Sequence, residues 1–334
     1  MKTAPYRPPL IHSIRRFEDP DLARQSMSTG PVVCIGTFDG VHRGQQAILA
    51  TGLAIAKASG RELLVLTFHP HPKSVVAPAH APLLLTEPDE KVALLLSYGA
   101  DLVLQLRFDR DLATLSAAEF LDAILLKKLN AASIVIGHDF GFGRGRQGSP
   151  ESMQVWGCDR SVEVVVVEAV NDTLLNQRIS SSLIRESLTS GLFDQAVRLL
   201  GHPYPVSGNV VRGAARGRQL GYPTWNLRLS ELKLPPPVGI YSGWAGRRIP
   251  HPAMAYYGSN PTFGGEGLRL EAHLFDVREP HEAQPDQTET VWLSGYIRPE
   301  VQFDSAEELK RQLAEDERIV RDILLTEPNT NPQS

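Results

Sequence analysis

The chain of 334 residues and 36.7 kDa is long enough for two domains that each bury a core of their own. Hydrophobic residues make up 42% of the composition and charged residues 22%, ordinary values for a globular protein that argue against disorder and against insertion into a membrane. The formal net charge of -4 argues against non-specific binding of nucleic acid, which needs a broadly basic face.

Cysteine usage and the N-terminal residues indicate the compartment. Cys34 and Cys158 are the only cysteines, too few for a disulfide framework, as is typical of the reducing cytoplasm. Residues 1–9 hold no apolar core of signal-peptide length, and no run approaches the ~18 apolar residues that a membrane helix needs. We therefore expect a cytoplasmic protein without a membrane span, and the sequence leaves its oligomeric state open.

Residues 31–46 predict a strand, a short polar loop and the start of a helix. The strand is expected at residues 32–35 and the helix at residues 45–57, because a β-branched apolar run precedes a helix-compatible segment. Glycines let backbone N–H groups approach an anion, and a helix N-terminus adds partial positive charge there. We predict a phosphate loop with His42 over the phosphates; the alternative is a plain strand-to-helix turn with a surface histidine.

Apolar strands then alternate with amphipathic helices. The strands are predicted at residues 63–68, 102–106, 133–136 and 162–167, and the helices at residues 88–98 and 117–129. Such strands, separated by helices, imply a doubly wound parallel sheet covered on both faces. Because ligands bind beyond the carboxyl ends of parallel strands, we expect the site residues in the loops that follow the strands.

Two of these loops carry distinctive residues, and the one at residues 137–148 suits a phosphorylated aromatic ligand such as a flavin nucleotide. After the second strand, His71 lies on a turn fixed by prolines, and a metal site with His69 lacks an evident third ligand. Residues 137–148 combine glycines and arginines with Phe140 and Phe142. The alternative is a loop whose phenylalanines are core anchors.

Residues 178–185, Arg-Ile-Ser-Ser-Ser-Leu-Ile-Arg, are predicted to open another helix. Serines at a helix start cap backbone N–H groups by default, which is the structural interpretation. Together with Arg185, the same turn could hold a triphosphate and neutralise departing pyrophosphate.

The pattern of predicted elements changes from alternating strands and helices to short strands near residue 201. A helix predicted at residues 192–200 ends at Gly-His-Pro-Tyr-Pro, and short β-like runs follow at residues 206–212, 239–245, 253–257, 268–275 and 291–297. This spacing is typical of a small antiparallel barrel. An amphipathic helix is predicted at residues 305–325. Because the pattern changes near residue 201, we predict domains at residues 1–200 and 201–334.

Residues 212–226 predict a second phosphate site. The segment is rich in glycine and arginine, which supply exposed amides and positive charge. Thr224 and Asn226 lie two apart on an extended segment, so both point to the same side and offer oxygens to Mg²⁺. The alternative is a basic turn before a strand.

These motifs together resemble the prokaryotic bifunctional riboflavin kinase and FMN adenylyltransferase (FAD synthetase) family over residues 12–325. Gly36-Thr-Phe-Asp-Gly-Val-His42 is similar to the phosphate loop of the His-x-Gly-His nucleotidylyltransferases that adenylate FMN, and residues 212–226 are similar to the riboflavin kinase element. The sequence departs from the family at Gln45, where a second histidine is usual, and at residues 277–286. The resemblance implies phosphorylation of riboflavin to FMN and adenylylation of FMN to FAD, both with ATP as co-substrate and Mg²⁺ as cofactor.

The resemblance also implies roles for individual residues. It implies ATP and phosphate contacts in the adenylyltransferase for Gly36, Phe38, Asp39, Gly40, His42, Gln45, Arg178, Ser181, Ser182 and Arg185. It implies flavin contacts for His71, Asp139, Phe140 and Phe142, and ATP contacts in the kinase for Gly213, Arg216, Gly217, Arg218 and Gly221. Mg²⁺ would be held by Thr224 and Asn226, and catalysis would rest on Glu271 as general base of the kinase and on His42 and Arg185 in the adenylyltransferase.

Two other functions are compatible with the sequence. A kinase could be paired with an adenylyltransferase half that Gln45 impairs, because glutamine carries no charge and exchanges no proton. The whole chain could instead be a non-catalytic flavin-binding module.

Overall fold

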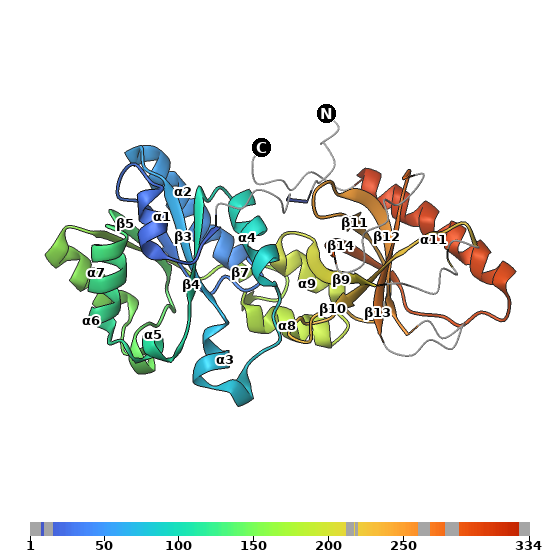
Figure 1. Cartoon of the computed structure of the whole chain (residues 1–334). Coiled ribbons are helices and arrows are strands. Elements are labelled where there is room, and N and C mark those ends of the chain that lie inside the picture. The colour runs from blue at the N-terminus through green and yellow to red at the C-terminus, as the bar shows by residue number, and fades with distance from the viewer. Residues whose placement is uncertain are drawn as a thin grey trace.

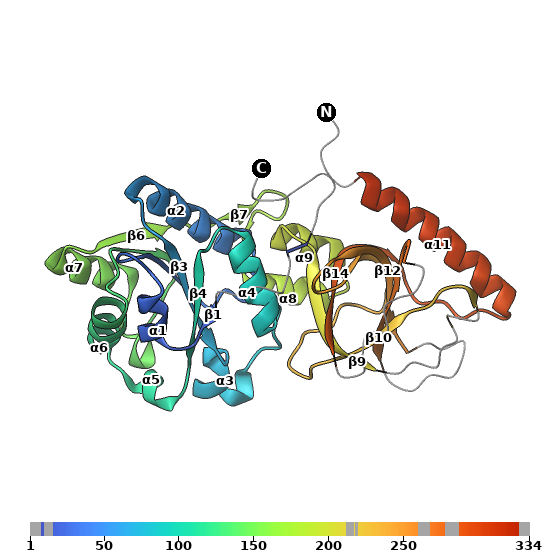
Figure 2. The same cartoon turned by 45° about the horizontal axis from the view of Figure 1, so that its top comes forward.

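A computed structural model of the chain describes residues 8–9, 16–211, 217, 220–259, 268–277 and 287–326. An N-terminal α/β half and a C-terminal barrel half lie side by side (Figures 1 and 2). Some predicted residues lie outside this description: Gly213, Arg216 and Arg218 of the kinase, and residues 278–286 of the segment at 277–286 that departs from the family.

The N-terminal half contains a sheet whose paired strands are all parallel, in the order β1-β4-β3-β2-β5-β6. Its strands are β1 (Arg16–Phe17), β2 (Val32–Ile35), β3 (Leu63–His69), β4 (Leu102–Arg107), β5 (Ser133–Gly137) and β6 (Glu163–Val167). The predicted parallel sheet is confirmed. Only two residues long, β1 was not predicted.

Both faces of this sheet are covered by helices, because successive side chains of a strand point to opposite sides. On β2, Val32 and Cys34 join one core cluster with Leu49, whereas Val33 and Ile35 join another with Leu125. The described helices of this half are α1 (Pro20–Gln25), α2 (Arg43–Ser59), α3 (Pro72–Val76), α4 (Pro88–Ser97), α5 (Arg110–Thr114), α6 (Ala117–Phe120), the π-helix η2 (Leu121–Lys128), α7 (Pro150–Arg160), α8 (Ser181–Thr189) and α9 (Phe193–Leu200), with 3₁₀ turns η1 (Pro78–His80) and η3 (Arg144–Arg146).

A small hairpin and two helices lead to the barrel. The hairpin strands are β7 (Asn171–Asp172) and β8 (Gln177–Arg178). The sequence predicted that Arg178 opens a helix, but it lies on β8, and α8 begins at Ser181 because the Ser180 side chain caps it through the Leu183 N–H at 3.2 Å. Downstream, α9 packs on the barrel, where the Phe193 and Tyr241 rings lie 4.8 Å apart.

The C-terminal half is a closed antiparallel barrel in the order β10-β13-β12-β11-β14-β9, as predicted. Its strands are β9 (Tyr204–Val211), β10 (Trp225–Leu229), β11 (Gly239–Ala245), β12 (His251–Gly258), β13 (Arg269–Leu274) and β14 (Thr288–Arg298). Only an extended segment was expected at β10, which closes the barrel by pairing with β9 and β13. Helix α11 (Ala306–Thr326) begins beside Ser305, whose hydroxyl accepts from the Glu308 N–H, and lies along the outside of the barrel (Figure 1).

Candidate functional sites

The first site lies where the strand order of the sheet reverses direction. From β2 the chain continues through β3 and β4 on one side, whereas β5 and β6 lie on the other. The loops that follow the neighbouring strands β2 and β5 therefore emerge at the same edge, the usual position of a ligand in an open α/β sheet. The sequence predicted this placement for its phosphate and flavin loops.

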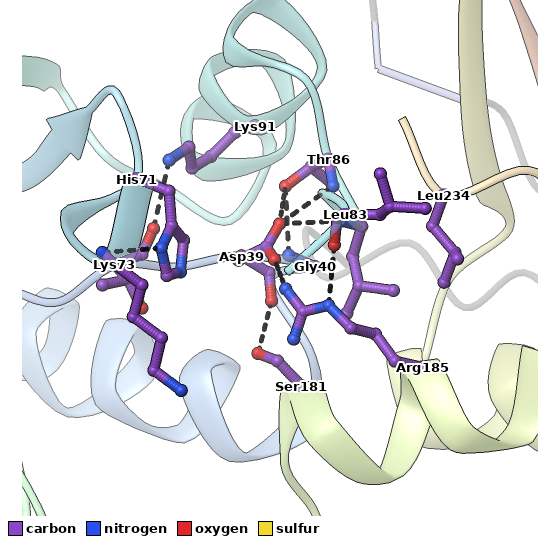
Figure 3. A network of polar contacts seen from close by, with 12 residues as sticks. Asp39, Gly40, His71, Lys73, Leu83, Thr86, Lys91, Ser181, Arg185 and Leu234 are labelled. Carbon is purple, nitrogen blue, oxygen red and sulfur yellow. Dashed lines mark hydrogen bonds and ion pairs between the residues drawn. The ribbon is translucent and has the colours of Figure 1, made fainter. Parts of the chain in front are cut away.

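A buried carboxylate, Asp39, organises this site (Figure 3). Its Oδ1 accepts hydrogen bonds from the Leu85 and Thr86 N–H groups, each at 3.0 Å, and its Oδ2 pairs with the Arg185 guanidinium. Its backbone carbonyl accepts from the Ser181 hydroxyl at 2.7 Å. The loop after β2 and the start of α8 thus meet at this site.

Arg185 is held in one direction by two acceptors. Besides its pairing with Asp39, its Nε donates to the Leu83 carbonyl at 2.7 Å. The side chain is 17% exposed and that of Asp39 is 2% exposed, so the charge pair is largely shielded from water. These contacts use two of the five N–H donors of an arginine.

His42 and Gln45 form a capping box at the start of α2. The Gln45 N–H faces His42 Nδ1 at 3.4 Å, and Gln45 Oε1 accepts from the His42 N–H at 3.1 Å. Burial lowers the pKa of His42 to about 4, so the ring is neutral at neutral pH. Because Nδ1 is the acceptor, we assign the ring proton to Nε2, which makes His42 an uncharged N–H donor.

The sequence predicted that the glycine loop presents its backbone amides to an anion, but two of these amides are hydrogen-bonded within the protein. The Gly36 N–H donates to the Leu66 carbonyl at 3.2 Å, and the Gly40 N–H donates to the Thr86 hydroxyl at 3.0 Å. Gly40 has a φ of 92°, and a Cβ there would lie 2.9 Å from the Leu85 side chain. The glycines therefore permit a tight turn, and Phe38, fully buried with a φ of 47°, anchors it.

The loop after β5, which the sequence predicted to contact flavin, reaches the same edge of the sheet. Arg178 donates to Asp139 at 2.9 Å, and the charges of both residues act on His42. The Phe140 and Phe142 rings stack with centroids 5.8 Å apart, but Phe142 is only 6% exposed and belongs to the core. Its burial favours the core-anchor alternative for Phe142, whereas Phe140 is half-buried.

The remaining predicted residues of this half lie at two helix starts. His71 caps α3, with the Lys73 N–H 3.2 Å from its Nδ1, and burial lowers its pKa. Ser182 is exposed on the first turn of α8. Lys91, a buried lysine of α4, was not predicted, because an unbroken helical pattern gives no signal for it. Its ammonium donates to the Thr37 carbonyl at 3.1 Å.

The second site lies on the outside of the barrel, where β10 pairs with β13. Asn226 stands opposite Glu271 in this pairing, and the Thr224 hydroxyl lies 3.3 Å from Glu271 Oε2. The Asn226 amide lies 3.5 Å from the same hydroxyl. The resemblance implied roles in the kinase for Thr224, Asn226 and Glu271, and the structure brings these three residues together.

Neighbouring residues fix the approach to this second site. His273 Nδ1 lies 2.9 Å from the Pro223 carbonyl, so this histidine holds the chain just before Thr224. Gly217 is hydrogen-bonded through its carbonyl to the Tyr222 N–H, and a Cβ there would lie 2.2 Å from the Tyr222 carbonyl oxygen. Gly221 has a φ of 90°, so both glycines serve the shape of this turn.

The chain matches two family models. The FAD synthetase model matches residues 24–183, and the riboflavin kinase model matches residues 200–324. The bifunctional riboflavin kinase/FMN adenylyltransferase of Escherichia coli strain K12 is 36% identical over 308 residues, which are 91% of this chain and 96% of the relative. This chain belongs to the bifunctional riboflavin kinase/FMN adenylyltransferase family.

Two further comparisons also cover most of the chain. The family member of Listeria monocytogenes is 33% identical over 293 residues, 87% of this chain and 91% of its own. A solved structure described as a macrolide-efflux protein from Streptococcus pneumoniae matches with a TM-score of 0.74 at 33% identity, covering 92% of this chain and 98% of that one. Among the described helices, none is both long and apolar enough to cross a membrane. The chain thus combines an FMN adenylyltransferase half with a riboflavin kinase half.

Proposed function

We propose that the α/β half transfers AMP from ATP to FMN at the site around Asp39, His42 and Arg185, and that the barrel half phosphorylates riboflavin at the site of Thr224, Asn226 and Glu271. The observation that carries the first assignment is the meeting of Asp39 with Arg185, 146 residues apart in sequence, at the switch point of the sheet. We propose a boundary between the domains after residue 200, where α9 ends, and a cytoplasmic location.

In the adenylyltransferase, the phosphate of FMN attacks the α-phosphorus of ATP and pyrophosphate leaves. Arg185, oriented by Asp39, neutralises charge that develops on the pyrophosphate, and Nε2 of His42 donates to a phosphate oxygen. The N-terminus of α2 adds its partial positive charge at the same place. No covalent intermediate on the enzyme is required, because the site would hold the phosphate of FMN in line with the α-phosphorus of ATP.

In the kinase, Glu271 accepts the proton of the terminal hydroxyl of riboflavin as this oxygen attacks the γ-phosphate of ATP. The donors at this site are hydroxyl, amide and carboxylate oxygens, the ligands that Mg²⁺ prefers, so Thr224 and Asn226 fit a Mg²⁺ ion. When bound, Mg²⁺ would neutralise charge on the nucleotide phosphates. Among the described residues, no group of three His, Cys, Asp or Glu side chains could hold a metal ion.

The product spectrum tests this assignment of two working sites. Pure protein incubated with riboflavin, ATP and Mg²⁺ should convert riboflavin through FMN to FAD, as followed by chromatographic separation of the flavins. Accumulation of FMN without FAD would favour the alternative in which the adenylyltransferase half is impaired. Unchanged riboflavin would contradict both enzymatic functions and favour a binding module.

Two substitutions of Gln45 separate its capping contact from a contact with phosphate. Gln45→Ala removes the acceptor for the His42 N–H and should lower the free energy of unfolding by about 1 kcal/mol, as measured by urea denaturation. Gln45→Glu keeps an acceptor and should preserve stability, but its negative charge should raise the KM for ATP in FAD formation about tenfold. An unchanged KM in Gln45→Glu would place position 45 away from the phosphates and leave it only the capping role.

A further inference from the structure

An ion pair lies completely buried between the two halves. Lys233, from the barrel half, places its ammonium 2.6 Å from Oε2 of Glu90 on α4, and both side chains are 0% exposed. The Glu90 carboxylate also accepts from the Ser207 N–H on β9 at 2.6 Å and from the Glu87 N–H at 2.8 Å. Burying two charges is costly unless hydrogen bonds satisfy them, as they do here.

The same ammonium reaches the backbone of the α/β half. Lys233 Nζ donates to the Leu85 carbonyl at 2.7 Å. Beside it, the Leu84 N–H donates to the Leu232 carbonyl at 2.7 Å, and the Leu234 N–H donates to the Leu84 carbonyl at 2.9 Å. Residues 84–85 are therefore held by the barrel half through three hydrogen bonds.

The same segment also contacts the proposed adenylyltransferase site, and Figure 3 shows its Leu83 and Thr86 beside Asp39 and Arg185. The Leu85 and Thr86 N–H groups donate to Asp39, and the Leu83 carbonyl accepts from Arg185. Residues 83–86 thus contact the barrel half with one set of backbone groups and the Asp39–Arg185 pair with another. A shift of Leu85 away from Lys233 would move the N–H that orients Asp39, because one peptide segment carries both contacts.

We propose that Lys233 is a positioning residue for FMN adenylylation, although it belongs to the riboflavin kinase half. It fixes residues 84–85, which fix the carboxylate of Asp39 and through it the guanidinium of Arg185. This inference rests on the proposed role of Asp39 and Arg185. It makes the barrel half a structural part of the adenylyltransferase site.

Kinetics of full-length variants test the inference. Lys233→Met leaves Glu90 buried without its cation, so the double variant Lys233→Met/Glu90→Gln is measured beside it, because it removes both charges and keeps an acceptor at position 90. In the double variant we expect kcat for FAD formation from FMN to fall about tenfold or more. We expect the KM for FMN and the turnover of riboflavin phosphorylation to stay within about twofold of the wild type, because neither the flavin loop nor Glu271 contacts Lys233 in the described residues.

Arg247→Met is the matched control. Arg247 is also a cation of the barrel half that pairs with a carboxylate of α4, Asp89, but its described bonds do not include residues 83–86. It should leave kcat for FAD formation unchanged. An equal loss in Arg247→Met, an equal loss of kinase turnover in the double variant, or wild-type kcat in the double variant would each overturn the inference. If Arg185→Gln also retained wild-type FAD formation, the proposed site itself would be the error.

Discussion

Glu271→Gln should lower the rate of riboflavin phosphorylation about 10²- to 10⁴-fold and leave FAD formation from supplied FMN unchanged. The expected loss is that of a general base, since the amide of glutamine cannot accept the proton of the attacking hydroxyl. Glu271 stands opposite Asn226 and within 3.3 Å of the Thr224 hydroxyl, so a base at this position reaches the place where the phosphate would be held. Initial rates of FMN formation from riboflavin, and of FAD formation from FMN, measure the two activities separately.

A carboxylate elsewhere in the barrel provides the control for this variant. Glu289 lies on β14 and accepts from the Arg247 N–H at 2.9 Å, a contact that the oxygen of a glutamine can keep. Glu289→Gln should phosphorylate riboflavin at the wild-type rate. If Glu271→Gln also phosphorylates riboflavin at that rate, the proton acceptor has been assigned to the wrong residue.

Arg185→Gln should lower kcat for FAD formation about 10²- to 10³-fold, the size of effect seen when one preorganised donor to developing charge is removed. It should also lower the free energy of unfolding by about 3 kcal/mol, because Asp39 is left buried without its cation. Riboflavin phosphorylation should be unaffected. Steady-state kinetics and urea denaturation measure the two effects.

A double variant separates these two effects of Arg185. Asp39→Asn/Arg185→Gln removes the unpaired charge, and an asparagine oxygen can still accept from the Leu85 N–H. Stability should therefore recover in large part while FAD formation stays low. Recovery of both would show that Arg185 supports the fold and takes no part in the reaction.

The strands of the sheet could be predicted because each is a short, uniformly apolar run. The strands of the barrel were harder to predict from the sequence. Residues 225–229 include Asn226 and Arg228, and their role as β10 depends on pairing with β9 and β13, which no local pattern shows. The position of α2 was predicted, but its first residue depends on the capping box of His42 and Gln45.

The candidate sites were predictable as sets of residues but not as sets of atoms. The motif placed Gly36 and Gly40 near the phosphates, yet the register of the sheet commits the Gly36 amide to Leu66, and Thr86 takes the amide of Gly40. The resemblance brought Asp39 and Arg185 together. Nothing local marked Lys233 or Glu90, because a buried ion pair between distant segments leaves no periodic signal in either of them.

The bridge between Leu84 and residues 232–234 has a consequence for dividing this protein. Backbone groups of each half form hydrogen bonds with backbone groups of the other half. The two halves are therefore not independent domains joined only by a linker. A fragment ending at residue 200 would expose to water the carboxylate of Glu90, which the intact chain covers completely. The segment beside the proposed nucleotide site is thus held by residues of both halves. Cutting the chain after residue 200 would remove the hydrogen bonds that residues 232–234 make with Leu84.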